Sequence, residues 1–392
     1  MLARLLPILG VTFIDILGFS ILIPILPYFA EHFGASDLTV GVLFSTFAAC
    51  QLAAGPFWGR LSDAVGRKRV LIVSQIGATA GWAMLGFAHD IGMVFAARVV
   101  EGVSGGNISV TQAYVADLVE ERSRARAFTY VGAAFSAGFV FGPAIGGALL
   151  TRYGFAAPFF VAAALQVLTL VLTIAMLPES RAAREDAAAV GWHEILRSVR
   201  TRGVAAILGQ TWIYSLALYG WFGVFALFLR AQLHLDAAQT SLLFAVYSAF
   251  SVALQLTIAG RIADALGDRK SSTVGLGLSV LAFAVAPFAT SYVVLALAFA
   301  LFSGGMTLAR PGLTSILSRA VPEDRRGAVL GLSSSLDNLS GVLMPPISTG
   351  LLGAFGAPWS VLPSGIFSLL ACAVGVAAQR GDRLVAPATA GD

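Results

Sequence analysis

Long apolar stretches follow one another along this chain, and each is near the ~20 residues with which an α-helix crosses a bilayer. Only 12% of the 392 residues are charged, about half of the ~25% that a soluble domain carries. The sequence therefore predicts an all-α membrane protein with about twelve transmembrane helices. The predicted spans are residues 7–30, 39–58, 70–88, 91–115, 127–150, 155–178, 204–229, 240–259, 272–289, 292–316, 327–353 and 357–379.

The basic residues are distributed unevenly around these spans. An even number of spans places both termini on one side of the membrane. All but four of the 25 Lys and Arg residues then fall on that side; the exceptions are Arg98, Arg152, Arg230 and Arg310. Because short cytoplasmic segments carry an excess of Lys and Arg, we predict a multi-pass protein of the cell inner (plasma) membrane with both termini cytoplasmic.

The chain also repeats itself. The segment 59–68 recurs as 260–270 with one inserted residue, Ser104-Gly105-Gly106 recurs as Ser303-Gly304-Gly305, and Pro143 recurs as Pro345. All three recurrences are displaced by roughly 200 residues, the mark of an internal duplication. We therefore predict two pseudo-symmetric six-helix bundles, residues 1–178 and 204–392, joined by a cytoplasmic linker at 179–203. Parallel repeats of this kind are a transporter architecture.

Charged residues inside the predicted spans are candidates for function. They are Asp15, Arg98, Glu101, Arg310 and Asp337. A charge near the bilayer centre costs at least ~2.5–3.5 kcal/mol, so each should face a cavity or a partner. Arg98 and Glu101 are spaced i, i+3 on one helix face and are predicted to pair. Asp337 is the expected partner of Arg310. We expect proton coupling at Asp15, Arg98, Glu101 and Asp337, because burial and a nearby cation shift proton affinity in opposite directions; static pairing is the alternative.

The segment Gly59-Arg-Leu-Ser-Asp63-Ala-Val-Gly66-Arg67-Lys68 follows the second predicted span, and Gly138-Phe-Val-Phe-Gly142-Pro143-Ala-Ile-Gly146-Gly147 lies in the fifth. The first looks like the loop 2–3 signature of the major facilitator superfamily, and the second resembles its antiporter signature. Asp15-Ile-Leu-Gly18 is similar to the first span of the drug/proton antiporters. Ala116-Asp117 followed by Glu121-Arg122, together with Asn338, resembles the tetracycline-resistance type. That type carries further acids where this chain has Gly81 and about Leu281, so the resemblance supports an antiporter better than a tetracycline substrate.

The resemblance implies the major facilitator fold and proton-coupled efflux of a small, partly apolar compound such as a drug, by alternating access. It implies a conformational latch of Gly59, Asp63, Gly66, Arg67 and Lys68, in which Asp63 faces the start of the eleventh span. The antiporter motif is Gly138, Gly142, Pro143, Gly146 and Gly147. Candidates for the wall of a substrate cavity between the halves are Gln51, Asn107, Tyr114, Phe135, Tyr214, Tyr219, Arg310 and Asn338.

Two other functions stay open. One is proton-coupled uptake of a metabolite, against which the fifth-span motif argues. The other is a membrane scaffold or receptor without transport, against which the absence of a long extramembrane segment argues. The sequence contains no paired nucleophile or metal-ligand cluster in a supporting context, so we expect no enzyme, no cofactor and no metal. The expected partners are a small-molecule substrate, protons and the lipid bilayer, without nucleic acid, and we expect a monomer.

Overall fold

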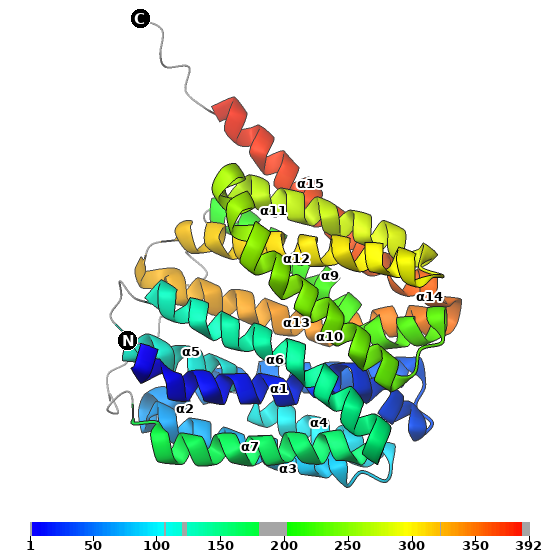
Figure 1. The fold of residues 1–392 in the computed structure, drawn as a ribbon. Coiled ribbons are helices and arrows are strands. Elements are labelled where there is room, and N and C mark those ends of the chain that lie inside the picture. Colours follow the sequence, from blue (N-terminus) through cyan, green and yellow to red (C-terminus); the bar gives the residue numbers. More distant parts are fainter. Residues whose placement is uncertain (1, 106, 120–123, 180–201, 322, 386–392) are drawn as a thin grey trace, which may run out of the picture.

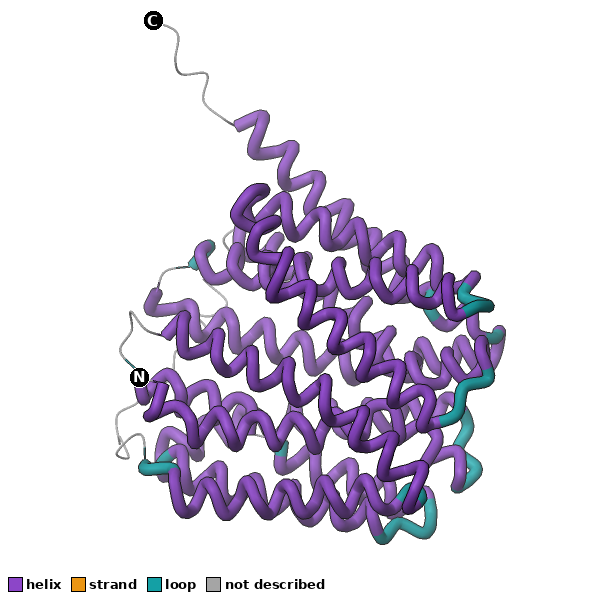
Figure 2. The backbone as a smooth tube through the Cα atoms, in the orientation of Figure 1, coloured by secondary structure: helices purple, strands orange, loops and turns teal. Residues whose placement is uncertain are grey.

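The computed structural model describes residues 2–105, 107–119, 124–179, 202–321 and 323–385. In this described part the chain is helical and contains no strand, as Figure 2 shows in a single colour for nearly the whole tube. Long helices lie roughly side by side, and α1 (Leu2–His32) and α15 (Leu362–Val385) both have an end on the side where the chain begins (Figure 1). We call this the terminus side, and the opposite end of the bundle the far side.

The described part of the first half contains seven helices. They are α1 (Leu2–His32), α2 (Asp37–Val65), α3 (Arg67–Gly86), α4 (Ile91–Ser104), α5 (Asn107–Leu118), α6 (Arg124–Tyr153) and α7 (Ala156–Met176). They follow the first six predicted spans, with one correction. The predicted span 91–115 is broken, because α4 ends at Ser104 and α5 begins at Asn107. The two intervening residues are glycines, which weaken a helix interior.

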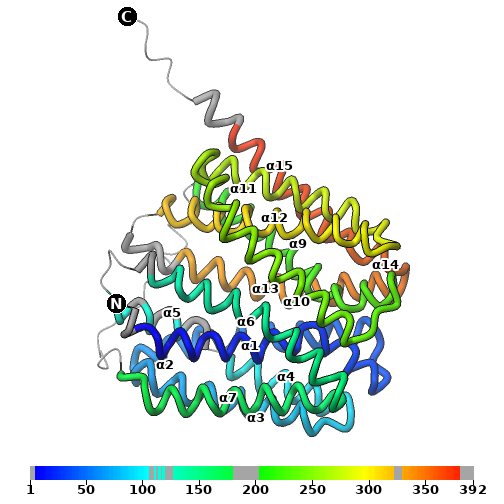
Figure 3. The backbone as a smooth tube through the Cα atoms, in the orientation of Figure 1, coloured from blue at the N-terminus to red at the C-terminus, as the bar shows by residue number. Residues whose placement is uncertain are grey.

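The second half follows the other six predicted spans. It contains α9 (Arg202–Leu233), α10 (Ala237–Leu254), a π-helical segment at Gln255–Ala259, α11 (Gly260–Val285), a 3₁₀ turn at Ala286–Phe288, α12 (Tyr292–Arg319), α13 (Glu323–Phe355), α14 (Ala357–Ser360) and α15 (Leu362–Val385). Its path from green to red occupies the upper part of Figure 3, beside the blue-to-green first half. The last predicted span, 357–379, is divided between α14 and α15.

Eight described segments are long and apolar enough to cross a membrane, and one of them, Ala237–Phe288, contains two predicted spans. The helices outside this set are α3, the broken α4–α5 pair and α13. Of these, α13 begins with four charged residues and carries Asp337 together with several serines and glycines. Polar content of this kind is expected of helices that line a cavity rather than face lipid alone.

The backbone confirms the internal duplication independently of side-chain identity. Six described residues have a positive φ, and they form three pairs about 200 residues apart: Gly34 with His234, Gly66 with Gly267, and Gly154 with Gly356. Side chains that cap helices at the far side recur in the same way. Ser36 and Asp236 cap α2 and α10, while Asp90 and Ser291 cap α4 and α12. The repeat therefore preserves where helices begin and where the chain turns, since both are fixed by local chemistry.

Two seams join the halves at the far side. In the first seam α2 packs against α13, and a Cβ at Gly41 would collide with Thr349 Oγ1 and lie 2.8 Å from the Pro345 carbonyl oxygen. Ser45 donates a hydrogen bond to the carbonyl of Val342 at 2.6 Å. In the second seam α6 packs against α10, where a Cβ at Gly147 would come within 2.9 Å of Ser241 Cβ. Small residues allow helix backbones to approach this closely within a membrane.

The first seam opens toward the terminus side. On α2, Gly55 and Gly59 continue the helix face that carries Gly41 and Ala48. A Cβ at either glycine would meet no described atom within 4 Å. On α13, Ser334 continues the face that packs on α2, and it is exposed. The described part of the bundle is therefore closed between its halves at the far side and separated along this seam at the terminus side.

Candidate functional site

The charged residues within the spans form three separate groups. Asp15 of α1 lies against α7, where its carboxylate accepts a hydrogen bond from Gln166 Nε2 at 3.0 Å. Gln166 is buried and is held by a second hydrogen bond to Thr169 Oγ1 at 3.1 Å. The described contacts give Asp15 and Arg98 different partners, Gln166 for the first and Glu101 for the second. Asp15 is therefore held within the first half by a neutral amide.

The second group is the predicted pair of Arg98 and Glu101, which the structure confirms as an ion pair on α4. The pair is buried, with 1% and 5% of the two side chains exposed. The Arg98 guanidinium also lies 4.3 Å from the ring centroid of Phe47 on α2, within the range of a cation–π interaction. Phe47 packs in turn near Phe19 of α1, at 6.0 Å between ring centroids. Aromatic rings thus cover the cation on the side of α1 and α2.

Gly81 of α3 explains one departure from the tetracycline-resistance type. A Cβ at this position would collide with Glu101 Cγ and lie 3.3 Å from the Glu101 backbone nitrogen. The space beside α3 is filled by the Glu101 side chain from α4. An acid could not occupy position 81 without displacing Glu101.

The third group joins α12, α13 and α9. Arg310 of α12 forms an ion pair with Asp337 Oδ2, as predicted, and Ser215 of α9 donates a hydrogen bond to Asp337 Oδ1 at 2.5 Å. Both carboxylate oxygens are therefore occupied. The Asp337 side chain is 12% exposed, whereas that of Arg310 is 40% exposed. This arginine, unlike Arg98, is accessible while it is paired.

The other predicted wall residues have diverse surroundings. Gln51 donates to the carbonyl of Gly105 at 3.1 Å, beside the break between α4 and α5. The Tyr114 hydroxyl donates to the carbonyl of Pro178 at 2.7 Å, at the end of the first bundle. Tyr214 is buried, and Tyr219 packs against Gly341 of α13. Phe135 and Asn338 are half-buried; the side chain of Asn107 lies outside the described part.

The latch residues are centred on Arg67, which is buried although it begins a helix at the terminus side. It forms ion pairs with Asp63 at 2.6 Å and with Asp117 at 3.3 Å, and it donates to Ser62 Oγ at 2.6 Å. Gly66 provides the positive φ of 102° that turns the chain from α2 into α3. The start of α13, which Asp63 is predicted to face, has side chains outside the described part.

Lys68 and Glu179 attach the same turn to the end of the first bundle. Lys68 Nζ donates to the carbonyl of Ile174 on α7 at 2.8 Å, and its backbone N–H donates to Glu179 Oε1 at 3.1 Å. A Cβ at Gly66 would lie 2.7 Å from that carboxylate. The sequence offered no signal for Glu179, which was assigned only to the linker.

The second-half copy of the latch requires a correction to the sequence alignment. Gly66 and Gly267 both have a positive φ, so the residue after each is equivalent. Arg67 therefore corresponds to Asp268. The sequence comparison had treated Asp268 as the inserted residue and had aligned Arg67 with Arg269. Asp268 accepts a hydrogen bond from Ser315 at 2.6 Å and pairs with Arg319 at 3.3 Å. Arg319 occupies on α12 the place that Asp117 has on α5, so the sign of the pair is reversed between the halves.

The antiporter motif packs against both halves. Gly138 and Gly142 of α6 face α1, where Ser20 donates to the carbonyl of Gly138 at 2.9 Å and would collide with a Cβ at Gly142. Gly146 also faces α1, and Gly147 faces α10 across the second seam. Pro143 is buried within the helix, where it removes one backbone hydrogen bond and allows bending.

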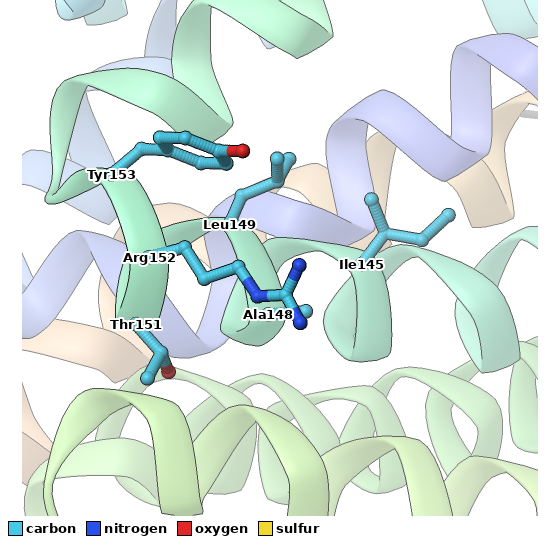
Figure 4. Close-up of a pocket in the computed structure, with 6 residues that line it drawn as sticks. All are labelled: Ile145, Ala148, Leu149, Thr151, Arg152 and Tyr153. Atoms are coloured by element: carbon cyan, nitrogen blue, oxygen red, sulfur yellow. The ribbon is translucent and has the colours of Figure 1, made fainter.

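A surface hollow at the far end of α6 is not this site. It is lined by Ile145, Ala148, Leu149, Thr151, Arg152 and Tyr153, all from α6. Figure 4 shows the Arg152 side chain reaching back along the helix toward Ala148. The hollow contains none of the charged residues described above. Its apolar wall beside an arginine and a tyrosine is typical of a helix surface near the membrane interface.

Two helical bundles that meet along glycine-rich seams, with acids buried in their spans, define a membrane transporter for a small-molecule substrate. The Major Facilitator Superfamily profile matches residues 8–230 and 211–389, one match for each half. The chain belongs to this superfamily of multi-pass membrane transporters.

Two relatives and one solved structure illustrate the similarity. The chain is 30% identical to the class C tetracycline resistance protein of Escherichia coli, over 91% of this chain and 92% of that protein. It is 28% identical to Multidrug resistance protein 2 of Bacillus subtilis (strain 168), over 86% and 85% of the two chains. Its fold resembles the crystal structure of the human organic anion transporter MFSD10 (TETRAN), with a TM-score of 0.76 at 22% identity, over 95% of this chain and 99% of that one.

Proposed function

We propose that this protein exports a small, partly apolar compound such as a drug in exchange for protons, and that it confers resistance to that compound. The proposal is supported by similarity to tetracycline and multidrug resistance proteins over about nine tenths of the chain. The substrate of any one relative is not carried over, because identity near 30% and the Gly81 departure leave the recognised compound open.

The observation that carries the proposal is the packing of the α6 motif. Its glycines contact α1 on one side and α10 on the other. A single bendable helix therefore packs against both halves at the far side, where the bundle is closed. A helix in this position can hold the far side closed while the seam between α2 and α13 is separated at the terminus side. This is the state in which an exporter takes up its substrate, if the terminus side is the cytoplasm.

The proton pathway is proposed to use the buried acids. A carboxylate exchanges protons between the two sides only if its neighbours change between the two states. Asp15 lies where α1 meets both α7 and, through Ser20, the α6 motif. Movement of α6 would therefore alter the packing of the helix that carries Asp15. We assign proton coupling first to Asp15, and next to Glu101 and Asp337, which are both held in ion pairs.

The proton role is tested in inverted membrane vesicles with an imposed pH gradient as the only driving force. The wild type should concentrate tetracycline or a fluorescent dye, drawn from a compound panel, inside such vesicles. Asp15→Asn should abolish this uphill movement and leave downhill exchange, because a permanently neutral amide cannot carry a proton. Asp90→Asn is the matched control, since Asn also caps a helix well. Uphill transport that survives Asp15→Asn would refute the assignment of the proton role to Asp15. Accumulation by the wild type under a pH gradient of the opposite direction would indicate a symporter.

The cytoplasmic position of the termini is tested separately. Single cysteines at Gly203 and Asp236 lie at opposite ends of α9, in a background lacking Cys50 and Cys372. In intact cells, an impermeant thiol reagent should label the cysteine at position 236 and leave that at position 203 unlabelled. The reverse pattern would show that the terminus side faces outward and that export is assigned the wrong direction.

A further inference from the structure

The far side carries a cluster of charged and hydroxyl groups that belongs to none of the motifs. Arg230, in the last turn of α9, belongs to the second half. Its described ion pairs are both with the first half, to Glu31 near the end of α1 and to Asp37 at the start of α2. The Arg230 Nη2 to Asp37 Oδ1 distance is 2.9 Å. One guanidinium therefore spans the turn between two helices of the opposite bundle.

Tyr28, about one helical turn before Glu31 on α1, makes a second connection between the two halves. Tyr28 shares a face of α1 with Glu31, at i, i+3 spacing. Its hydroxyl donates to the carbonyl of Leu235 at 2.8 Å and lies 2.7 Å from Thr240 Oγ1, which then acts as the donor. Leu235 and Thr240 both lie around the start of α10 in the second half. The first half therefore contributes Tyr28 to a contact with the second half, just as the second half contributes Arg230 to a contact with the first.

The cluster is shielded from water only in part. The side chains of Arg230, Glu31 and Asp37 are 35%, 19% and 21% exposed. Partial burial strengthens an ion pair relative to a fully exposed one, and a planar guanidinium can serve two carboxylates at once. If the halves separated at the far side, these charges would be hydrated singly. The cluster therefore stabilises the conformation that is closed at the far side and not the one that is open there, as a conformational switch requires.

We propose that Tyr28, Glu31, Asp37 and Arg230 form a far-side lock that holds the transporter closed at this end, and that the transport cycle must break it. The lock complements the glycine seams, which supply close packing but no charge. It rests on neither the substrate nor the direction of transport, because it concerns only the balance between two conformations. Its test therefore needs no substrate, and its failure would leave the proposed function standing.

Two single cysteines report the two ends of the bundle. Ser241 lies buried in the α6–α10 seam, and its described hydrogen bond is to the carbonyl of Ala237 on its own helix, so Ser241→Cys is the first reporter. Ser334→Cys lies exposed on the α2-facing side of α13, toward the terminus side. Each is placed in the Cys50→Ala, Cys372→Ala background, in protein purified into lipid nanodiscs whose two faces are both accessible. The measured quantity is the rate of labelling by a water-soluble maleimide.

Arg230→Ala should raise the labelling rate at position 241 by about tenfold, within the range of typical conformational coupling, and should lower the rate at position 334. Arg152→Ala, which removes an exposed arginine at the far-side end of α6, is the matched control and should leave both rates within about twofold. Glu31→Gln with Asp37→Asn should reproduce the Arg230→Ala effect, and adding Arg230→Ala to that pair should change little further, because the interaction is already lost.

The outcomes separate clearly. Unchanged labelling at position 241 in both Arg230→Ala and the Glu31→Gln, Asp37→Asn variant would overturn the lock. So would faster labelling at both reporter positions, which is general loosening. An effect of Arg230→Ala that the carboxylate variant does not share would also overturn it. If Arg230→Ala does not yield folded protein by size-exclusion chromatography, the carboxylate variant and Tyr28→Phe, for which a smaller rise is expected, decide the question.

Discussion

The turn at Gly66, between α2 and α3, and the turn at Gly267, within α11, are the same structure with opposite charge. In the first half Arg67 pairs with Asp117, and in the second half Asp268 pairs with Arg319. Both pairs attach the start of one span to the end of the next, directly after a glycine with positive φ. The attachment therefore depends on having opposite charges at the two positions, and not on which position is basic.

The two turns differ in whether the nearby acid, Asp63 or Asp264, has a cation beside it. Arg67 also binds Asp63, four residues earlier on α2. At the equivalent place Asp264 precedes Asp268 by four residues, and like charges at this spacing repel. Asp264 is exposed and forms no ion pair with any described residue. The first-half turn thus positions an acid at the terminus side, whereas the second-half turn only fastens two helices.

A second contrast concerns the two intramembrane arginines. Arg98 has 1% of its side chain exposed and is covered by Phe47, while Arg310 has 40% exposed. The first half thus buries its cation as part of the protein interior. The second half leaves its cation accessible, with Ser215 also holding the Asp337 carboxylate. Variants at these two arginines and at the two turns test both contrasts.

Breaking the buried pair should be the most damaging change. Arg98→Ala leaves the Glu101 carboxylate buried without its cation, which typically costs about 3–5 kcal/mol of stability. Low levels in the membrane and a lower unfolding temperature in detergent are the expected results. Arg310→Ala should yield folded protein, because Asp337 keeps its bond from Ser215, but it should impair transport. Equal instability of the two variants would show that exposure of Arg310 does not distinguish its role.

The double variant Arg310→Ala with Asp337→Ala separates pairing from substrate contact. If the pair is purely structural, the double variant should recover transport that the single one lost, since no buried charge is left unpaired. If Arg310 contacts the substrate, the double variant should stay inactive although it reaches the membrane in normal amounts. Transport rate normalised to membrane protein is the measurement that decides between them.

The two latch copies should differ in function. Asp63→Asn should reduce transport by about tenfold, equivalent to ~1.4 kcal/mol, without impairing insertion. Asp264→Asn should change it by less than about twofold, because this acid forms no ion pair with a described residue. Initial transport rates normalised to membrane protein provide the measurement. Equal losses at the two positions would mean that the halves act symmetrically at the terminus side.

The features that could be predicted from the sequence are local ones. Spans, halves and the pairs Arg98–Glu101 and Arg310–Asp337 followed from apolar length, repetition and charge within the spans. The break between α4 and α5 was missed, because two adjacent glycines permit a break without requiring one. The reversed pair was missed because Asp268 was read as an insertion, and only the φ angles of the two turn glycines align it with Arg67.

Contacts between helices distant in the chain could not be predicted from spacing. Gln166 as the partner of Asp15, and Arg230 as the link to Glu31 and Asp37, join residues more than a hundred positions apart. Nothing within either segment marks the other as its neighbour. Gly81 is a related case, since the Glu101 side chain of the next span fills the space that a side chain at position 81 would need.

Exchanging the two charges of the first-half turn should have the smallest effect on stability. Arg67→Asp alone places a third carboxylate beside Asp63 and Asp117, and it should destabilise the protein by about 1–3 kcal/mol. Adding Asp117→Arg recreates the arrangement of the second-half pair and should restore the unfolding temperature to within the equivalent of about 1 kcal/mol. Transport should nevertheless stay low, because Asp63 then has a carboxylate four residues further on in place of a guanidinium, as Asp264 does. Full recovery of transport in the exchanged variant would show that Asp63 does not need a cation beside it, and that the two turns are functionally alike despite their opposite charges.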